Sequence, residues 1–397
     1  MNTQGHKRKS VGELCDFVNG NGFRPPDWKQ SGLPIIRIQN LNGSKNFNYF
    51  DGVPKNKWIV EPGDLLFAWA GVKGVSFGPT IWSGPKGVLN QHIFRIVPNA
   101  GVDKYWLYLA LQVATRRIEA NAHGFKSSLV HVHKDDVTNQ VVDLPPLPEQ
   151  RKIAEILRTW DEAIEKLEAL RAAKQRRLAA VAQRLMAPTR SIGPDVIRSN
   201  WPLCAFGDVF SERQDRNDAL QSDDVVTVGK YAIRKQSEHF TRSVASADLS
   251  SYWVISAGDF VYDPMSAYYG AIGRYTAQSD GIVSPAYRVI RLSTAVDPDF
   301  MVHLLRTHHI RFLLETRSSQ GNKEGKRRLL QRDEFDSIDF FLPPIEEQRR
   351  IVEVLSQFER DRHLTDQELQ LVIRQKRGLM QKLLTGEWRV KLEPADA

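Results

Sequence analysis

Two patterns of apolar and polar residues alternate along the chain. Short apolar runs flanked by Gly, Pro and Asn predict β-strands, first at residues 34–40, 64–69 and 92–97 and later at 225–228, 259–262 and 287–290. Asp103 is placed to cap a helix after the first set, and a second helix is predicted to open near Asp297. These runs predict two lobes of mixed α/β (α+β) structure.

A heptad pattern follows each lobe. In the first half, apolar residues keep alternating steps of four and three at Ile153, Leu157, Trp160, Ile164, Leu167, Leu178, Val181 and Leu185. The second half does the same at Ile351, Leu355, Phe358, Leu369, Val372, Leu379 and Leu383. Such a stripe predicts two long helices that pair as a coiled coil. Proline pairs set their starts, Pro188 ends the first helix, and Gly386 is expected to cap the second.

Polar residues that interrupt the two stripes indicate the direction of pairing. An antiparallel alignment with Ile153 opposite Leu383 brings Arg171 and Lys174 to the level of the second interruption, Arg362 and Thr365. The sequence therefore predicts an antiparallel coiled coil, although it places Lys174 opposite the like-charged Arg362. The alternative is that each helix packs on its own lobe.

A helix over 150–187 is roughly 55 Å long. This length exceeds the ~34 Å between successive major-groove faces on one side of B-DNA, so a pair of such helices is long enough to hold two DNA-reading lobes a helical turn or more apart.

The chain also repeats itself. Residues 144–157 (LPPLPEQRKIAEIL) return as residues 342–355 (LPPIEEQRRIVEVL), 198 positions later. Two upstream matches have nearly the same offset, because 62–67 (PGDLLF) resembles 257–262 (AGDFVY) and 87–97 resembles 281–290. We infer a pseudo-twofold internal repeat of a lobe followed by a long helix. The predicted domains are 1–144 and 191–342 for the lobes, 145–190 and 343–390 for the spacer helices, and 391–397 for a C-terminal tail.

Composition adds limits on the class of protein. The 397 residues carry a formal net charge of +8, which suits a polyanionic partner. Cys15 and Cys204 are the two cysteines, a count that favours a reducing cytoplasm over a disulfide framework. The N-terminal residues are polar, and no run of eighteen apolar residues occurs, so neither a signal peptide nor a membrane span is expected.

The order of these elements resembles the specificity subunits of type I restriction-modification systems. The Pro-Pro…Glu-Gln element before each long helix carries the resemblance, together with the closing residues 384–390 (LTGEWRV), and it extends over essentially the whole chain. The resemblance implies two target-recognition domains, each reading one half of a split DNA sequence. It implies no cofactor on this chain, methyltransferase subunits that bring S-adenosylmethionine, and a restriction subunit that uses ATP and Mg.

The same resemblance suggests where partner subunits dock. The methyltransferase subunits are expected on the outer faces of the helices, around Glu149, Gln150, Arg151, Glu347, Gln348 and Arg349. Acidic residues at a helix N-terminus also favour the helix dipole. For Glu149 and Glu347, stabilisation of the helix and docking of a partner therefore remain open alternatives.

Candidate DNA contacts lie in loops of both lobes. The basic loop over 317–332 offers Lys323, Lys326, Arg327 and Arg328 to phosphates, and Lys126 lies in its less basic counterpart. The glycine-rich loops after the Gly-Asp strands offer Tyr268 and Arg274 in the second lobe and Lys73 in the first, although each loop could equally be an ordinary hairpin. Arg37, Gln39 and Asn40 have suitable side chains for base edges.

Two other functions compete with DNA recognition. A nuclease or methyltransferase active site on this chain is not favoured, because the Asn/Asp-Pro-Pro-Tyr/Phe motif is missing and Gly321–Lys326 falls one residue short of a phosphate-binding loop. A scaffold that holds partner proteins without touching DNA would show no salt-dependent DNA binding.

Overall fold

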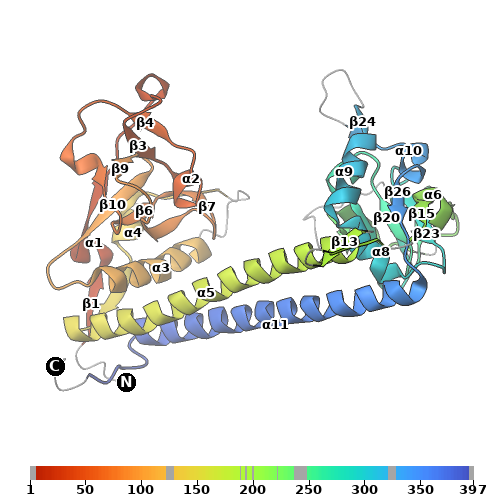
Figure 1. Ribbon diagram of the computed structural model, residues 1–397. Helices are drawn as coiled ribbons and strands as arrows, with labels where there is room; N and C mark the ends of the chain where they lie inside the picture. Colours follow the sequence, from red (N-terminus) through yellow and green to blue (C-terminus); the bar gives the residue numbers. More distant parts are fainter. Residues whose placement is uncertain are drawn as a thin grey trace. The chain divides into compact units, whose positions relative to one another are not determined.

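The computed structural model describes residues 6–121, 129–187, 189–192, 195–198, 201–220, 222–236, 248–320 and 328–392. These residues form two compact units (Figure 1). Unit 1 comprises Met1–Glu168 and Glu368–Ala397, and unit 2 comprises Ala169–Gln367. Each unit therefore contains one lobe, the beginning of one long helix and the end of the other.

The lobe of unit 1 is built on two four-stranded sheets. The first has the order β2 (Cys15–Asn19), β10 (Ile93–Pro98), β6 (Leu65–Ala68) and β8 (Gly78–Ile81), all antiparallel. The second has the order β4 (Asn48–Phe50), β3 (Leu33–Ile36), β9 (Gly87–Leu89) and β5 (Ile59–Val60), with β3 and β9 parallel. Two strand pairs complete it: β1 (Lys7–Ser10) with β12 (Val141–Leu144), and β7 (Ala70–Val72) with β11 (Leu129–His131).

The helical elements of this lobe include one long helix and several single turns. The helix α3 (Lys104–Asn121) begins where Asp103 accepts hydrogen bonds from the backbone N–H groups of Tyr105 and Trp106, both at 2.9 Å, as the sequence predicts. The shorter elements are α1 (Val11–Leu14), η1 (Pro25–Asp27), α2 (Ile38–Leu41), η2 (Asn56–Trp58) and α4 (Lys134–Thr138).

The lobe of unit 2 is built on a corresponding sheet. Its order is β16 (Phe210–Arg213), β23 (Arg288–Leu292), β20 (Phe260–Tyr262) and β21 (Ile272–Arg274). Further strand pairs are β15 (Leu203–Ala205) with β26 (Asp339–Phe341), β17 (Val226–Gly229) with β18 (Ala232–Lys235), β19 (Trp253–Ile255) with β22 (Gly281–Val283), β24 (Ser319–Gln320) with β25 (Arg328–Leu329), and β13 (Thr189–Ile192) with β14 (Asp195–Arg198).

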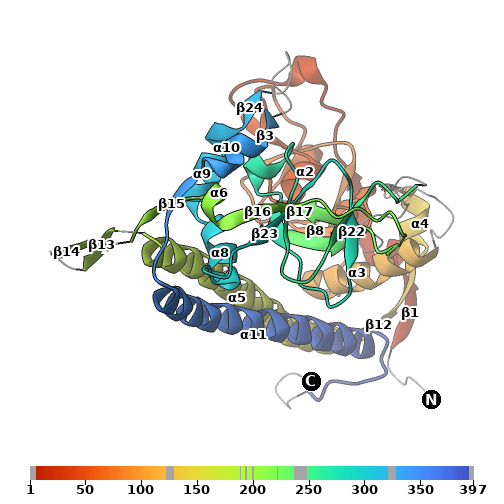
Figure 2. The same ribbon diagram turned by 90° about the vertical axis from the view of Figure 1, so that its right-hand side faces the viewer.

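Helices pack against one side of this sheet and share a hydrophobic core with it. They are α6 (Phe206–Val209), η3 (Ala267–Tyr269), α8 (Pro298–Leu305), α9 (His308–Arg317) and α10 (Arg332–Asp336). Asp297 caps α8 by accepting from the N–H groups of Asp299 and Phe300, so the predicted helix opening is confirmed. Figure 2 shows α8 between the strands of unit 2 and the long helices.

The internal repeat is confirmed at the level of strand pairing. The sheet β2-β10-β6-β8 of unit 1 corresponds to β16-β23-β20-β21 of unit 2, and the pair β1-β12 corresponds to β15-β26. A glycine repeats as well, since a Cβ on Gly12 would meet α4 at 3.1 Å and a Cβ on Gly207 would meet α10 at 3.1 Å. One predicted strand is shorter than the sequence pattern indicates. The strand expected over 34–40 ends at Ile36, because Arg37 precedes the helical turn α2.

The long helices are α5 (Leu147–Leu185) and α11 (Ile345–Leu384), and they pair antiparallel within each unit. In unit 2 the Lys174 ammonium lies 2.7 Å from Asp361 and 2.8 Å from the Thr365 hydroxyl. In unit 1 Lys376 pairs with Asp161. The antiparallel prediction is confirmed. Arg362 turns to Asp366 at 2.8 Å, so the like-charge conflict with Lys174 does not arise.

Both helices also pack on the lobes, so the alternative arrangement is partly realised. In unit 1 the start of α5 (Ile153, Leu157) and the end of α11 (Met380, Leu383) share one core cluster with the lobe. In unit 2 Leu178 of α5 and Leu355 of α11 belong to the core cluster of that lobe. Gly386 has φ +70°, as expected for a helix C-cap, and α5 ends at Leu185, while Pro188 lies outside the described residues.

Candidate functional site

The Pro-Pro…Glu-Gln element of unit 1 joins the long helix to its lobe through Gln150. The Gln150 side chain is 1% exposed. Its carbonyl oxygen accepts from the backbone N–H of Asp103 at 2.8 Å, and its amide donates to the carbonyls of Gly101 and Pro145 at 3.1 and 2.9 Å. One side chain thus fixes the start of α5 to the residue that caps α3.

Gln348 repeats this joint in unit 2. It is also 1% exposed, and its carbonyl oxygen accepts from the N–H of Asp297 at 2.7 Å. Its amide donates to the carbonyls of Pro343 and Ala295 at 2.8 and 3.4 Å. The repeated glutamine therefore has a structural role that a hydrophobic side chain could not fill, since each buried backbone group needs a partner.

The glutamate before each of these glutamines is bonded to residues outside the long helices. Glu149, 2% exposed, receives two hydrogen bonds of 2.7 Å from the Arg389 guanidinium, and His6 lies 3.4 Å from the same carboxylate. Burial by itself raises the pKa of Glu149, but the bonds from Arg389 and the proximity of His6 outweigh it, so the pKa is lower than usual. In unit 2 Glu347 accepts from the indole N–H of Trp201 at 2.9 Å.

These contacts correct the predicted docking surface. Glu149, Gln150 and Gln348 lie inside their units and not on an outer face. Arg151 and Arg349 are exposed, and Arg349 pairs with Glu346 at 2.8 Å. Docking at these two arginines stays a prediction, while the motif itself serves the joint between lobe and helix. The signal for this role was the repetition of Gln beside a predicted helix cap.

The predicted DNA-contacting residues of unit 2 gather in part. The Arg328 guanidinium lies 5.5 Å from the Tyr268 ring centroid and 3.3 Å from Glu315. Tyr268 follows the Gly-Asp strand on η3, beside the exposed Tyr269. Arg274, in contrast, pairs with Asp299 at 2.9 Å. Tyr268 and Arg328 thus form one cluster of an aromatic ring and a cation, with Arg274 held by α8.

In unit 1 the predicted residues serve several local contacts. The Lys73 ammonium donates to the Glu119 carbonyl at 2.8 Å. Arg37 lies over the Trp28 ring, 4.6 Å from its centroid. Gln39 donates to the Asn46 carbonyl at 3.2 Å.

Asn40 is 4% exposed and holds its own loop. Its carbonyl oxygen accepts from the N–H of Arg37 at 2.9 Å, and its amide donates to the carbonyls of Ser44 and Asn46, both at 3.0 Å. With both ends of its amide occupied, Asn40 positions the loop, which argues against the predicted direct contact with a base. Lys126, Lys323, Lys326 and Arg327 lie outside the described residues.

One pair of an arginine and a tryptophan in unit 2 was not predicted from the sequence. Arg216 lies over the Trp253 ring at 4.5 Å, a geometry similar to that of Arg37 over Trp28 in unit 1. The two partners are far apart in the sequence, so no local motif announces the pair. Each lobe thus carries an arginine on a tryptophan near its surface.

The described residues contain no group of three His, Cys, Asp or Glu side chains that could hold a metal ion. None of the helices within the described ranges is long and apolar enough to cross a bilayer.

Comparison with known proteins agrees with this architecture. Residues 4–174 match the type I restriction modification DNA specificity domain. The chain is 24% identical to the type I restriction enzyme EcoBI specificity subunit of Escherichia coli, over 97% of this chain and 86% of that protein. It is also 24% identical to the MjaVIII specificity subunit of Methanocaldococcus jannaschii, over 86% and 83% of the two chains. The chain is thus similar to type I specificity subunits over most of its length.

Solved structures have the same fold. The S subunit of a type I restriction-modification system from M. genitalium aligns over 97% of both chains, with a TM-score of 0.52 and 14% identity. A chain from a study of complex assembly and conformational transition of the type I R-M system aligns over 97% of this chain and 99% of its own length, with a TM-score of 0.55 and 16% identity. The chain therefore shares its fold with these two structures.

Proposed function

We propose that the chain recognises a bipartite DNA target, with each lobe reading one half-site, and that the chemistry of the assembled system resides on other subunits. The observation that carries the proposal is the duplicated lobe, joined each time by the same buried glutamine to an antiparallel helix pair. The relatives that the chain matches over 86% and 83% of their length are specificity subunits, and this supports DNA recognition in place of catalysis.

We assign the contacts with DNA phosphates and bases to loops of each lobe. In unit 2 they comprise Tyr268 and Arg328, with Lys323, Lys326 and Arg327 from the adjoining segment outside the described residues. In unit 1 we assign Lys73, Lys126, Arg37 and Gln39. Basic side chains on phosphates supply affinity, whereas side chains at base edges supply specificity. The net charge of +8 is in keeping with this role.

The partners follow from the family. We propose that methyltransferase subunits carrying S-adenosylmethionine bind the helices, and that a restriction subunit using ATP and Mg completes the complex in the cytoplasm. The chain itself is proposed to bind none of these cofactors. Arg151 and Arg349 remain the exposed parts of the predicted docking surface.

Fluorescence anisotropy across a salt series tests DNA binding. We expect the chain to bind random duplexes with an affinity that falls steeply as salt rises, and Lys326→Ala with Arg327→Ala to lower the salt slope by about 1 per lost phosphate contact. Arg176→Gln, an exposed arginine on α5, is the matched control. A wild-type chain without a salt slope would favour the protein scaffold instead.

A further inference from the structure

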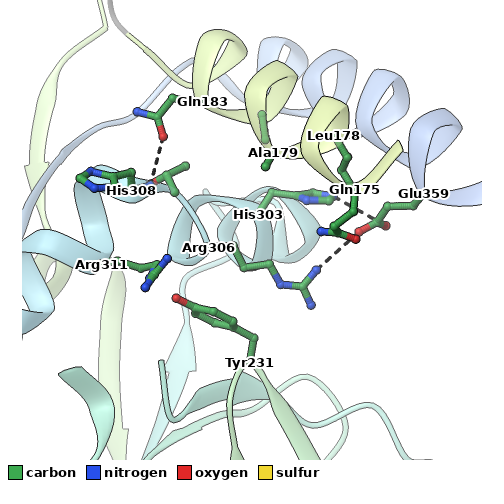
Figure 3. A pocket seen from close by; sticks show the side chains of 12 residues that line it. Gln175, Leu178, Ala179, Gln183, Tyr231, His303, Arg306, His308, Arg311 and Glu359 are labelled. Atoms are coloured by element: carbon green, nitrogen blue, oxygen red, sulfur yellow. Dashed lines mark hydrogen bonds and ion pairs between the residues drawn. The ribbon is translucent and has the colours of Figure 1, made fainter. Parts of the chain in front are cut away.

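Unit 2 contains a pocket at a break in the helix of its lobe. In unit 1 the helix α3 runs uninterrupted over Lys104–Asn121, whereas in unit 2 the corresponding stretch is divided into α8 and α9. Thr307 caps the new helix, because its hydroxyl accepts from the N–H of Ile310 at 3.4 Å. The pocket at this break has a volume of about 420 Å³ and is lined by residues of α5, α8, α9 and α11 and by Tyr231 (Figure 3).

Arg311 brings an uncompensated positive charge to this pocket. It lies in the first turn of α9 and is exposed, and within the described ranges of the chain no carboxylate lies at ion-pair distance from it. Glu359, the carboxylate of the pocket lining, lies 3.5 Å from Arg306. Figure 3 shows the Arg306 guanidinium turned toward Glu359. These two charges offset each other, so Arg311 is the cation that is available to an anionic ligand.

Tyr231 supplies a hydroxyl beside this cation. Its oxygen is buried and has no hydrogen-bond partner among the described residues, and Figure 3 shows it directed toward Arg311. Burial raises the pKa of Tyr231 although the charges of Arg311 and Arg306 act against it, so the hydroxyl keeps its proton and can donate. A buried hydroxyl without an acceptor is unfavourable, and an oxygen of a ligand at this place would stabilise it.

The position of the Tyr231 ring is fixed by its surroundings. Tyr231 lies in the turn between β17 and β18 with φ +52°, and its N–H donates to the Gly270 carbonyl at 2.7 Å. A Cβ on Gly270 would lie 2.6 Å from the tyrosine ring, so the ring packs directly on the glycine that follows η3. A strained backbone of this kind persists where the surroundings impose it, often at binding sites.

A second pair of a tyrosine and an arginine lies one helical turn further along α9. The Arg328 guanidinium is 5.5 Å from the centroid of the Tyr268 ring and 3.3 Å from Glu315. Glu315 follows Arg311 by four residues on α9, a distance of about 6 Å along the helix. The pair of Tyr231 and Arg311 is therefore continuous with the cluster of Tyr268 and Arg328.

Unit 1 is built differently at the equivalent place. Glu119, the counterpart of Glu315 at an offset of 196, accepts from the N–H of Gly74 at 2.8 Å, and Lys73 donates to its carbonyl at 2.8 Å. The glycine-rich loop of unit 1 thus binds the end of α3 itself. The break between α8 and α9 gives unit 2 a cationic site that the continuous helix of unit 1 does not form.

We propose that Arg311 and the Tyr231 hydroxyl hold a phosphate of the DNA backbone, one contact further along the strand than Tyr268 and Arg328. The proposal rests on the proposed function and adds a site to it. Phosphate oxygens accept from both a guanidinium and a hydroxyl, and the charged bond is the stronger one. Phosphates of one strand advance by ~3.4 Å along the DNA axis, so cations about 6 Å apart match phosphates one or two nucleotides apart. Exposure of Arg311 leaves the site open to a polymer.

The test is fluorescence anisotropy of the full chain with random duplexes across a salt series. Arg311→Gln removes one charge, so we expect the salt slope to fall by about 1 and binding to weaken alike for every sequence. Arg311→Lys keeps the charge and should keep the slope. Tyr231→Phe removes a hydrogen bond and no charge, so we expect binding to weaken by roughly 3- to 10-fold at an unchanged slope. Arg176→Gln, an exposed arginine of α5 outside the pocket lining, is the control and should bind as the wild type does.

The outcomes separate this site from the proposed function. A normal slope of the wild type with an unchanged slope of Arg311→Gln, or an unchanged affinity of Tyr231→Phe, overturns the site and leaves DNA recognition standing. Thermal stabilisation of the wild type by inorganic phosphate, lost in Arg311→Gln while that variant keeps the full DNA salt slope, would identify a site for a free anion and also overturns it. A loss confined to particular sequences would make Arg311 a reader of bases and contradicts a phosphate contact. A wild-type chain without any salt slope rejects the proposed function itself.

Discussion

Gln150 and Gln348 show how one polar residue can define a repeated joint. Each satisfies three backbone groups at a place where a loop, a helix cap and a helix start converge. A buried donor or acceptor left without a partner costs about 1–3 kcal/mol. The glutamine is therefore required by its surroundings, whichever DNA sequence the lobe reads.

Gln150→Ala tests this requirement. The substitution leaves the Asp103 N–H and the carbonyls of Gly101 and Pro145 without their hydrogen-bond partner. We therefore expect the free energy of unfolding to fall by about 2–3 kcal/mol in chemical denaturation. The exposed neighbour gives the control, since Arg151→Ala should change stability by less than about 0.5 kcal/mol. A loss below 1 kcal/mol for Gln150→Ala would mean that water replaces the side chain.

The ion pair of Glu149 and Arg389 predicts a dependence on pH. The pKa of Glu149 is lowered in the folded chain, so its contribution is present above the unfolded value of about 4.5 and is lost as pH falls through the lower folded value. We expect Glu149→Gln to be less stable at neutral pH and to lose less stability than the wild type between pH 5 and 3. Parallel pH profiles of unfolding for the two proteins would contradict this.

At the scale of the element, the helix pair combines apolar ends with a polar centre. Ile351 and Leu355 pack in one core and Met380 and Leu383 in the other, while Lys174 and Thr365 meet between them. Thr365 is 3% exposed, so this contact is largely shielded from water. Buried polar contacts in coiled coils set register and direction more than they stabilise.

The double variant Lys174→Leu with Thr365→Val separates register from stability. Because an apolar pair replaces a desolvated polar one, we expect the free energy of unfolding to stay within about 1 kcal/mol of the wild type or to rise. Crosslinking between cysteines introduced on α5 and α11 should then report more than one helix register. A stability loss above 2 kcal/mol with a single register would show that the polar contact holds the helices together.

At the scale of the whole molecule, the function depends on two reading lobes linked by one pair of helices. The proposal predicts that the gap between half-sites follows the helix length. Removing one heptad from each helix at matched positions, 165–171 and 365–371, shortens each by ~10 Å, or about three base pairs.

We expect mapping of methylated adenines in cells carrying this variant to show the same half-sites with a shorter gap. The undeleted chain in the same cells is the control. Methylation that persists at the original spacing would exclude a spacer role for the helices.

The sequence by itself determined the repeat, the heptads and the helix caps, because these depend on periodicity and on residues adjacent in the chain. The caps at Asp103 and Asp297 and the antiparallel pairing could be predicted in this way. The end of the strand at Ile36 could not, because the local hydrogen bonds of Asn40 outweigh the strand propensity of the run.

Tertiary structure alone decided which polar residues are exposed. Glu149 and Gln150 read as surface groups in the sequence, yet partners from the chain ends and from Asp103 bury them. Burial and charge pairing are set by contacts between segments far apart in the chain, and no local pattern records them.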